Sequence, residues 1–290
     1  MDKDFNPFPV TGYRGPRYFC DREEETALLQ KHIKNGINTT LFAIRRLGKT
    51  GVIQHLMEGY KNSRSISCIY VDILSTRSLK EFSNQLATAI YQQFPENRSA
   101  GKKIIDFIRH LSPVISYDSL SGQPEVSFET SEIKRTEKTI QQLFTFLDKQ
   151  GKKVVFAIDE FQQVLEYPEK NTEAVLRSCI QHLKNTRFVF CGSDQKMMHE
   201  IFSSAKRPFF ASCSSLHMGY IEQEKYEAFI SKIFKQHKRS VDSESLSFIY
   251  EWTLGHTYYV QYLCNHLFSL NIKHIRMADV REAAADILKQ

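Results

Sequence analysis

The chain has 290 residues, of which 41% are hydrophobic and 25% are charged, as in an average globular protein. Its 21 Phe and 13 Tyr exclude disorder for most of the chain, because disordered chains lack large apolar side chains. The net charge of +6 permits nucleic-acid binding but does not argue for it, since the basic residues are scattered.

The longest uninterrupted apolar run, at 154–158, is far shorter than the ~20 residues needed to span a bilayer. The charged start of the chain lacks the apolar segment of a signal peptide. We therefore expect a cytoplasmic protein with no membrane partner. No two of the six cysteines form a Cys-x-x-Cys pair, which favours reduced core thiols over a zinc site.

Strand and helix patterns alternate through the first part of the chain. After an irregular start, three glutamates open a predicted helix at 21–33, where the helix dipole favours acidic side chains. The elements predicted next are a strand at 40–44, a helix at 51–60, a strand at 66–73 and a helix at 79–93.

Residues 97–135 depart from this alternation. They contain a predicted short helix at 102–111 and two segments of alternating polarity that flank Ser-Gly-Gln-Pro. This pattern predicts a β-hairpin inserted into the main fold.

Strand patterns return after the insertion and end near residue 220. A helix with its apolar stripe at 140–147 is followed by predicted strands at 154–158, 187–192 and 215–220, with a helix after residue 171. The four apolar periodicities beyond residue 221 are helical, at 224–237, 243–252, 258–270 and 277–289. We therefore expect an α/β core at 1–220 and an all-helical unit at 221–290.

The strongest motif lies between the first predicted strand and its helix. It follows the phosphate-binding pattern G-x-x-x-x-G-K-[ST], except that Ala43 stands at the first glycine. Backbone N–H groups and the helix N-terminus would bind phosphate. As a loop residue with no expected part in the core, Lys49 would reach the β- and γ-phosphates, and Thr50 would ligate Mg²⁺. The predicted nucleotide-binding residues here are Ala43, Ile44, Arg45, Arg46, Leu47, Gly48, Lys49, Thr50 and Gly51.

Two acids follow the buried strand at 154–158. Asp159 would bind Mg²⁺, and Glu160 would act as the general base toward water. Open α/β sheets bind ligands at such strand ends. A solvated strand end is the alternative interpretation, which the phosphate-loop motif upstream makes less favoured.

The strand at 187–192 ends before a Gly-Ser-Asp turn. Ser193 is the candidate for a polar side chain facing the γ-phosphate. The alternative is a turn that only caps the following helix.

These motifs together resemble the archaeal-type ATPases of the AAA+/STAND class. The resemblance rests on the Asn-Pro-Phe and Tyr-Phe-Cys-Asp-Arg-Glu segments near the N-terminus, the doubly basic phosphate loop, the Asp-Glu-Phe strand end and a Leu-Gly-His-Thr-Tyr lid element. It implies a three-layer αβα P-loop core with a parallel five-stranded sheet of order 5-1-4-3-2 and a helical lid. It also implies nucleotide contacts from Arg22 and His256, although Asp21 and Thr257 replace a glycine and a proline of the family pattern.

The predicted reaction is hydrolysis of ATP with Mg²⁺, and its predicted output is a conformational switch. A hydrolysis-poor signalling scaffold is one alternative, motivated by Ala43 and Asp21. A DNA-associated ATPase is another, motivated by the net charge and the basic cluster at 235–239, although basic residues at a helix end also have a structural role.

The catalytic arginine has three candidates. Arg45 and Arg46 lie in the phosphate loop and would act within one subunit. Arg207 would act on the nucleotide of a neighbouring subunit, which implies a homo-oligomer. The alternative role of Arg207 is to cap the C-terminus of the preceding helix.

Overall fold

The computed structural model describes residues 5–94, 106–129 and 132–289. The chain divides into two compact units. The first unit comprises residues 1–27, 43–58 and 218–290, and the second comprises residues 28–42 and 59–217. The domain division at residue 220 that the sequence suggests stays a prediction.

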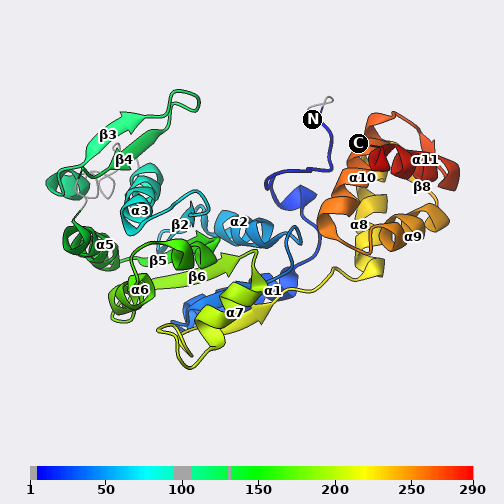
Figure 1. Ribbon diagram of the computed structural model, residues 1–290. Helices are drawn as coiled ribbons and strands as arrows, with labels where there is room; N and C mark the ends of the chain where they lie inside the picture. The colour runs from blue at the N-terminus through cyan, green and yellow to red at the C-terminus, as the bar shows by residue number, and fades with distance from the viewer. Residues whose placement is uncertain (1–4, 95–105, 130–131, 290) are drawn as a thin grey trace. The chain divides into compact units, whose positions relative to one another are not determined.

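A five-stranded parallel sheet forms the centre of the second unit (Figure 1). Its strand order is β2–β5–β6–β1–β7, which confirms the predicted order 5-1-4-3-2 when the five strands are numbered along the chain. The strands are β1 (Thr39–Phe42), β2 (Ile66–Asp72), β5 (Lys153–Asp159), β6 (Thr186–Gly192) and β7 (Ser214–His217).

One face of this sheet carries an aromatic core. Phe144 of α5 (Ile133–Asp148) lies edge-on to Phe156 of β5 and Phe188 of β6, with ring centroids 5.7 and 5.3 Å apart. Phe202 of α7 (Gln195–Ser203) packs on Phe190 of β6, 5.2 Å between centroids. Because side chains alternate along a strand, the neighbouring residues of β5 and β6 point to the opposite face.

The carboxyl ends of four strands lie at one edge of the sheet. The register pairs Asp72 of β2 with Asp159 of β5, and Phe42 of β1 with Gly192 of β6. A side chain at Gly192 would displace its neighbours, because a Cβ there would lie 2.0 Å from Oε1 of Gln162 and 2.8 Å from Sδ of Met198. The parallel sheet therefore brings the predicted acidic strand end and the predicted Gly-Ser turn to the same edge.

The predicted insertion contains the expected hairpin. Strands β3 (Val114–Tyr117) and β4 (Pro124–Ser127) pair antiparallel. Residues 106–110 are helical, and the earlier part of the predicted helix at 102–111 lies outside the described residues. The remaining helices of the second unit are α3 (Leu79–Gln93) and α6 (Thr172–Ile180), with the 3-10 helix η2 (Phe161–Glu166).

The first unit contains four helices after β7: α8 (Gln223–Gln236), α9 (Ser243–Trp252), α10 (Thr257–Ser269) and α11 (Met277–Leu288). The expectation of an all-helical unit was wrong in one respect, because β8 (Ser240–Val241) and β9 (His274–Ile275) form a short parallel pair. Each is only two residues long, too short to give an alternating pattern.

The N-terminal segment belongs to the core of this first unit. Phe8 is buried and its ring lies 4.9 Å from that of Phe234. The side chain of Asn6 donates to the carbonyl of Asn265, and the side chain of Asn265 donates to the carbonyl of Phe8. The Asn-Pro-Phe segment thus has a structural role in holding the chain start on α8 and α10.

Two helix starts differ from the prediction. The helix α1 (Glu23–Lys34) begins two residues late because Asp21 and Arg22 have φ values of 55° and 75°, which a right-handed helix excludes. The helix α2 (Lys49–Tyr60) begins two residues early, so that Lys49 is its first residue. None of the described helices is long and apolar enough to cross a membrane.

Candidate functional site

The predicted phosphate loop leaves β1 and enters α2 through six residues without regular structure. The amide of Val52 donates to the carbonyl of Gly48 at 3.0 Å, which begins the helical hydrogen bonding. Gly48 has a φ of 95° and Arg46 a φ of 66°. The left-handed conformation suits glycine but is unfavourable for arginine, and such backbone strain is concentrated at functional sites.

Lys49 is buried, with 6% of its surface exposed. Its ammonium group donates to the carbonyls of Ala43 and Ile44, at 3.2 and 3.4 Å. The expectation that Lys49 has no part in the core was therefore wrong, because its side chain is buried and hydrogen-bonds the first residues of the loop. An ammonium group that already points to the backbone of the loop is also placed to donate to a phosphate oxygen.

The remaining loop residues differ in exposure. Ala43 and Leu47 are buried, whereas Ile44, Arg45, Arg46 and Thr50 are exposed. Ala43 is not one of the described residues with positive φ. The alanine is therefore compatible with the backbone at the position where the phosphate-binding pattern has glycine.

The start of α10 contacts the phosphate loop inside the first unit. His256 Nε2 lies 3.0 Å from the carbonyl oxygen of Arg45, to which the Nε2–H tautomer donates. The guanidinium carbon of Arg46 lies 4.5 Å from the ring centroid of Tyr258, within the range of a cation–π interaction. Burial, and secondarily the charge of Arg46, lowers the pKa of His256. The lowered pKa favours the neutral form of His256.

Arg22 is buried and bound to protein groups of the first unit. Its guanidinium donates to Glu25 Oε1 at 2.7 Å and to the carbonyl of Gly219 at 2.8 Å. A role for Arg22 at the nucleotide stays a prediction. These contacts give the side chain a structural role that links the N-terminal segment to the start of the helical region.

An aromatic cluster that the sequence analysis missed lies against α2. The ring of Phe19 stacks on that of His55, 4.5 Å between centroids, and the hydroxyl of Tyr13 lies 2.9 Å from His55 Nδ1. A Cβ at Gly51 would lie 3.2 Å from Phe19. The Tyr-Phe-Cys segment next to Arg22 was the available signal for this cluster, but its partner on α2 has no local signature.

Asp159 lies at the end of β5 with 3% of its surface exposed. Its Oδ2 accepts a hydrogen bond from the hydroxyl of Tyr70 at 2.8 Å. Its Oδ1 accepts from the amide of Glu160 at 3.0 Å and from the thiol of Cys191 at 2.9 Å. These neutral donors orient the carboxylate without neutralising its charge.

Glu160 begins the turn after β5 with a φ of 56°. Its Oε2 accepts from the amide and hydroxyl of Ser193, at 3.0 and 2.7 Å, and from the side-chain amide of Gln162 at 2.5 Å. The structure therefore brings together the predicted base and the predicted polar residue after β6. Gln162 was missed, because nothing in its local sequence distinguishes it from a helix residue.

Arg207 forms ion pairs inside its own subunit. It donates to Glu173 Oε2 at 2.8 Å and to Glu200 of α7. Burial raises the pKa of Glu173, and the nearby Arg207 opposes that effect. Arg207 therefore pairs with Glu200 of the preceding helix α7. This contact resembles the alternative role, in which Arg207 caps the C-terminus of that helix.

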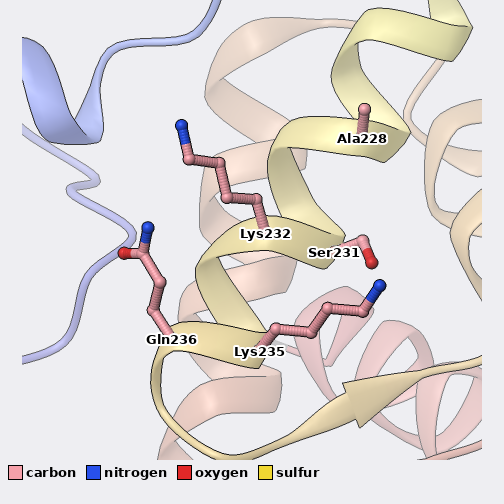
Figure 2. Close-up of a pocket in the computed structure, with 5 residues that line it drawn as sticks. All are labelled: Ala228, Ser231, Lys232, Lys235 and Gln236. Carbon is pink, nitrogen blue, oxygen red and sulfur yellow. The ribbon is translucent and has the colours of Figure 1, made fainter.

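The basic cluster at 235–239 divides into two parts. Arg239 donates to the carbonyl of Phe268 and to Asn271 Oδ1, and its guanidinium stacks over the ring of Phe268. Lys232 and Lys235 of α8 are among the residues that line a pocket of about 530 Å³ (Figure 2). Arg239 thus has the structural role, at the end of α10, whereas Lys232, Lys235 and Lys238 are exposed.

Thr50 of the first unit and Asp159 of the second each carry the kind of oxygen ligand that Mg²⁺ prefers. This ion binds through one or two carboxylates plus water and phosphate. In the described part of the chain, no group of three or more His, Cys, Asp or Glu could hold a metal by itself. A cation bound at either residue would therefore depend on oxygens of the nucleotide.

The comparisons with known proteins agree with this fold. A family described as an ATPase domain predominantly from Archaea matches residues 19–263. None of the curated proteins matches the chain.

Several solved structures share the fold at low sequence identity. A Walker-type ATPase of Pyrococcus abyssi is 16% identical over 98% of this chain and 76% of its own, with a TM-score of 0.67. The ORC2 protein of Aeropyrum pernix, in ADPNP–ADP complexes, is 14% identical over 98% and 72%, with a TM-score of 0.63. The ORC1 protein of Aeropyrum pernix, in complex with DNA, is 13% identical over 97% and 67%, with a TM-score of 0.59.

The parallel sheet and the helical C-terminal region give the chain the α/β fold of P-loop AAA+ ATPases. The chain belongs to the archaeal ATPase-domain family whose pattern covers residues 19–263, and it is an ATP-hydrolysing enzyme.

Proposed function

We propose that this ATPase hydrolyses ATP with Mg²⁺ and that the hydrolysis drives a conformational switch of the helical region. The observation that supports the switch is the hydrogen bond between His256, at the start of α10, and the carbonyl of Arg45 in the phosphate loop. A phosphate that displaces the backbone of this loop would change a contact with α10 directly. A difference in contacts between the two nucleotide states is what such a switch requires.

The residue roles follow the chemistry of each group. The N–H groups of the loop and the ammonium of Lys49 would bind the phosphates. Thr50 and Asp159 would hold Mg²⁺, which supplies charge neutralisation of the phosphates when bound. Glu160 would accept the proton of the attacking water, with Ser193 and Gln162 orienting its carboxylate.

A single kinetic experiment tests both the hydrolysis and the switch. Trp252 in α9 is the one tryptophan of the chain, so its emission reports on the helical region alone. After ATP is mixed with enzyme and Mg²⁺, we expect the emission of Trp252 to change and then to return as phosphate is released. With EDTA in place of Mg²⁺, phosphate release should stop.

Each other outcome of that experiment has a defined meaning. A lasting emission change with almost no phosphate release would favour the hydrolysis-poor scaffold. Phosphate release without any emission change would contradict the switch.

We also propose that Arg207 acts on the nucleotide of a neighbouring subunit in a homo-oligomer. To do so it would exchange its ion pairs with Glu173 and Glu200 for a phosphate of the neighbour. An arginine in this role contributes about 10³–10⁵ to the rate. We therefore expect specific activity to rise with protein concentration, and Arg207→Ala to bind ATP normally but hydrolyse it slowly.

Mixing two inactive variants separates this role from a structural one. Arg207→Ala combined with Lys49→Ala should recover part of the activity, because one type of mixed interface joins an intact loop to an intact arginine. Glu200→Gln is the matched control, since it removes one ion pair but keeps Arg207. Activity that is independent of concentration, without recovery on mixing, would leave Arg45 or Arg46 as the candidate.

DNA association has weaker support. The Aeropyrum pernix ORC1 structure contains DNA, but that likeness concerns the fold. In this chain Arg239 is engaged with α10, which leaves the exposed Lys235 and Lys238 of the basic cluster, with Lys232 one turn earlier on α8, for phosphate contacts. A cytoplasmic location stays part of the proposal.

A further inference from the structure

The carboxylate of Asp159 is held from two sides by residues outside the acidic motif. Tyr70 lies on β2 and Cys191 on β6, the two strands that flank β5. The phenol donates to Oδ2 at 2.8 Å, and the thiol donates to Oδ1 at 2.9 Å. Each carboxylate oxygen therefore has a side-chain donor from a different neighbouring strand.

The parallel register produces this arrangement. Tyr70 pairs with Ala157 and Asp72 with Asp159, so Tyr70 and Asp159 point to the same face, one step of two residues apart. Ile158 pairs with Phe190, which places Cys191 beside Asp159 on that face. This face is opposite to the aromatic core, and its two donors converge on one acid.

The two donors differ in burial, since Tyr70 is half-buried and Cys191 is fully buried. The hydroxyl of Tyr70 donates to Oδ2 of Asp159 at 2.8 Å. Cys191 has no exposed surface. The amide of Glu160 supplies a third donor at 3.0 Å, and together the three donors restrict rotation of the carboxylate.

We propose that Tyr70 and Cys191 are positioning residues that fix the Asp159 carboxylate for the nucleotide-bound Mg²⁺. This inference rests on the proposed role of Asp159 as a magnesium ligand. Groups that hydrogen-bond a ligating carboxylate orient it, and their loss typically lowers metal affinity by about 10–100-fold. Tyr70 carries the larger part, because a phenol is a stronger donor than a thiol.

The test measures Mn²⁺ affinity of the full chain with saturating ADP by electron paramagnetic resonance. We expect Tyr70→Phe to weaken Mn²⁺ binding by about 10–100-fold and Cys191→Ala to weaken it less. ADP affinity in EDTA should stay unchanged for both variants. In steady state, Tyr70→Phe should raise the Mg²⁺ concentration for half-maximal activity more than it lowers kcat at saturating Mg²⁺.

Tyr60→Phe is the matched control. The hydroxyl of Tyr60 is also buried but has no hydrogen-bond partner within the described residues, so its removal should leave Mn²⁺ affinity unchanged. Thermal melting in EDTA without nucleotide reports whether each variant folds. If Tyr70→Phe does not fold, Cys191→Ala decides, and an unchanged Mn²⁺ affinity in that variant overturns the proposal.

Asp159→Asn separates failure of this proposal from failure of the proposed function. Weak Mn²⁺ binding in Asp159→Asn, with wild-type binding in Tyr70→Phe, would overturn only the positioning role. Wild-type binding in Asp159→Asn would show that Asp159 is not a ligand, and the positioning role would fall with it.

Discussion

Replacing Lys49 by alanine is expected to abolish measurable ATP binding. The ammonium group is buried at the start of α2 and donates to the carbonyls of Ala43 and Ile44. Removing one partner of a buried, hydrogen-bonded charge pair costs about 2–5 kcal/mol, which is roughly 30-fold to several thousand-fold in affinity. Isothermal titration with ATP measures the loss.

The structural part of Lys49 requires its own control. Alanine removes both the cation and the brace between loop and helix, so the melting temperature without nucleotide should be recorded beside the affinity. Lys152→Ala, at an exposed lysine, should change neither quantity. ATP affinity of wild-type strength in a folded Lys49→Ala protein would refute the phosphate-loop assignment.

Glu160→Gln is expected to retain ATP binding and to lower turnover by about 10²-fold or more, the usual contribution of a general base. The glutamine amide keeps the shape of the side chain, and its oxygen can still accept the hydrogen bonds that Ser193 and Gln162 now make to Oε2. It cannot accept a proton from water. The backbone at position 160 is left-handed, with a φ of 56°. Glutamine would adopt the same conformation as glutamate there, so the backbone strain is unchanged.

Phosphate release at saturating ATP measures this effect, and titration with ATP checks the binding. Glu166→Gln, an exposed acid at the end of η2, is the matched control and should keep wild-type turnover. Unchanged turnover in Glu160→Gln would exclude Glu160 as the base.

The succession of strands and helices along the chain follows from patterns that are local, whereas the order of the strands within the sheet was implied by the family resemblance. A short run of β-branched and aromatic residues predicts a strand wherever it occurs, and the helix α3 at Leu79–Gln93 begins and ends where its apolar periodicity does. The start of α1 was placed wrongly because the backbone of Asp21 and Arg22 is left-handed, and no local pattern marks that conformation in residues other than glycine. The strands β8 and β9 have no sequence signal because two residues are too few to show an alternating pattern.

The candidate site was predictable where its residues are contiguous. The loop at 43–51 and the Asp-Glu pair after β5 are each written in one stretch of chain, so spacing alone identifies them. Tyr70, Cys191 and Gln162 were not predicted as site residues. Their relevance depends on contacts with Asp159 and Glu160, and two of them lie on other strands.

The sequence by itself determined the class of protein, through the phosphate loop, the acidic strand end and the alternation of strands and helices. Only the tertiary structure decided which side chains surround these motifs: Tyr70 and Cys191 on Asp159, Glu173 and Glu200 on Arg207, and His256 on the carbonyl of Arg45. The physical reason is distance along the chain. Backbone conformation and motif spacing depend on neighbours a few residues away, whereas these hydrogen bonds depend on strand register and helix packing between segments that the sequence keeps far apart.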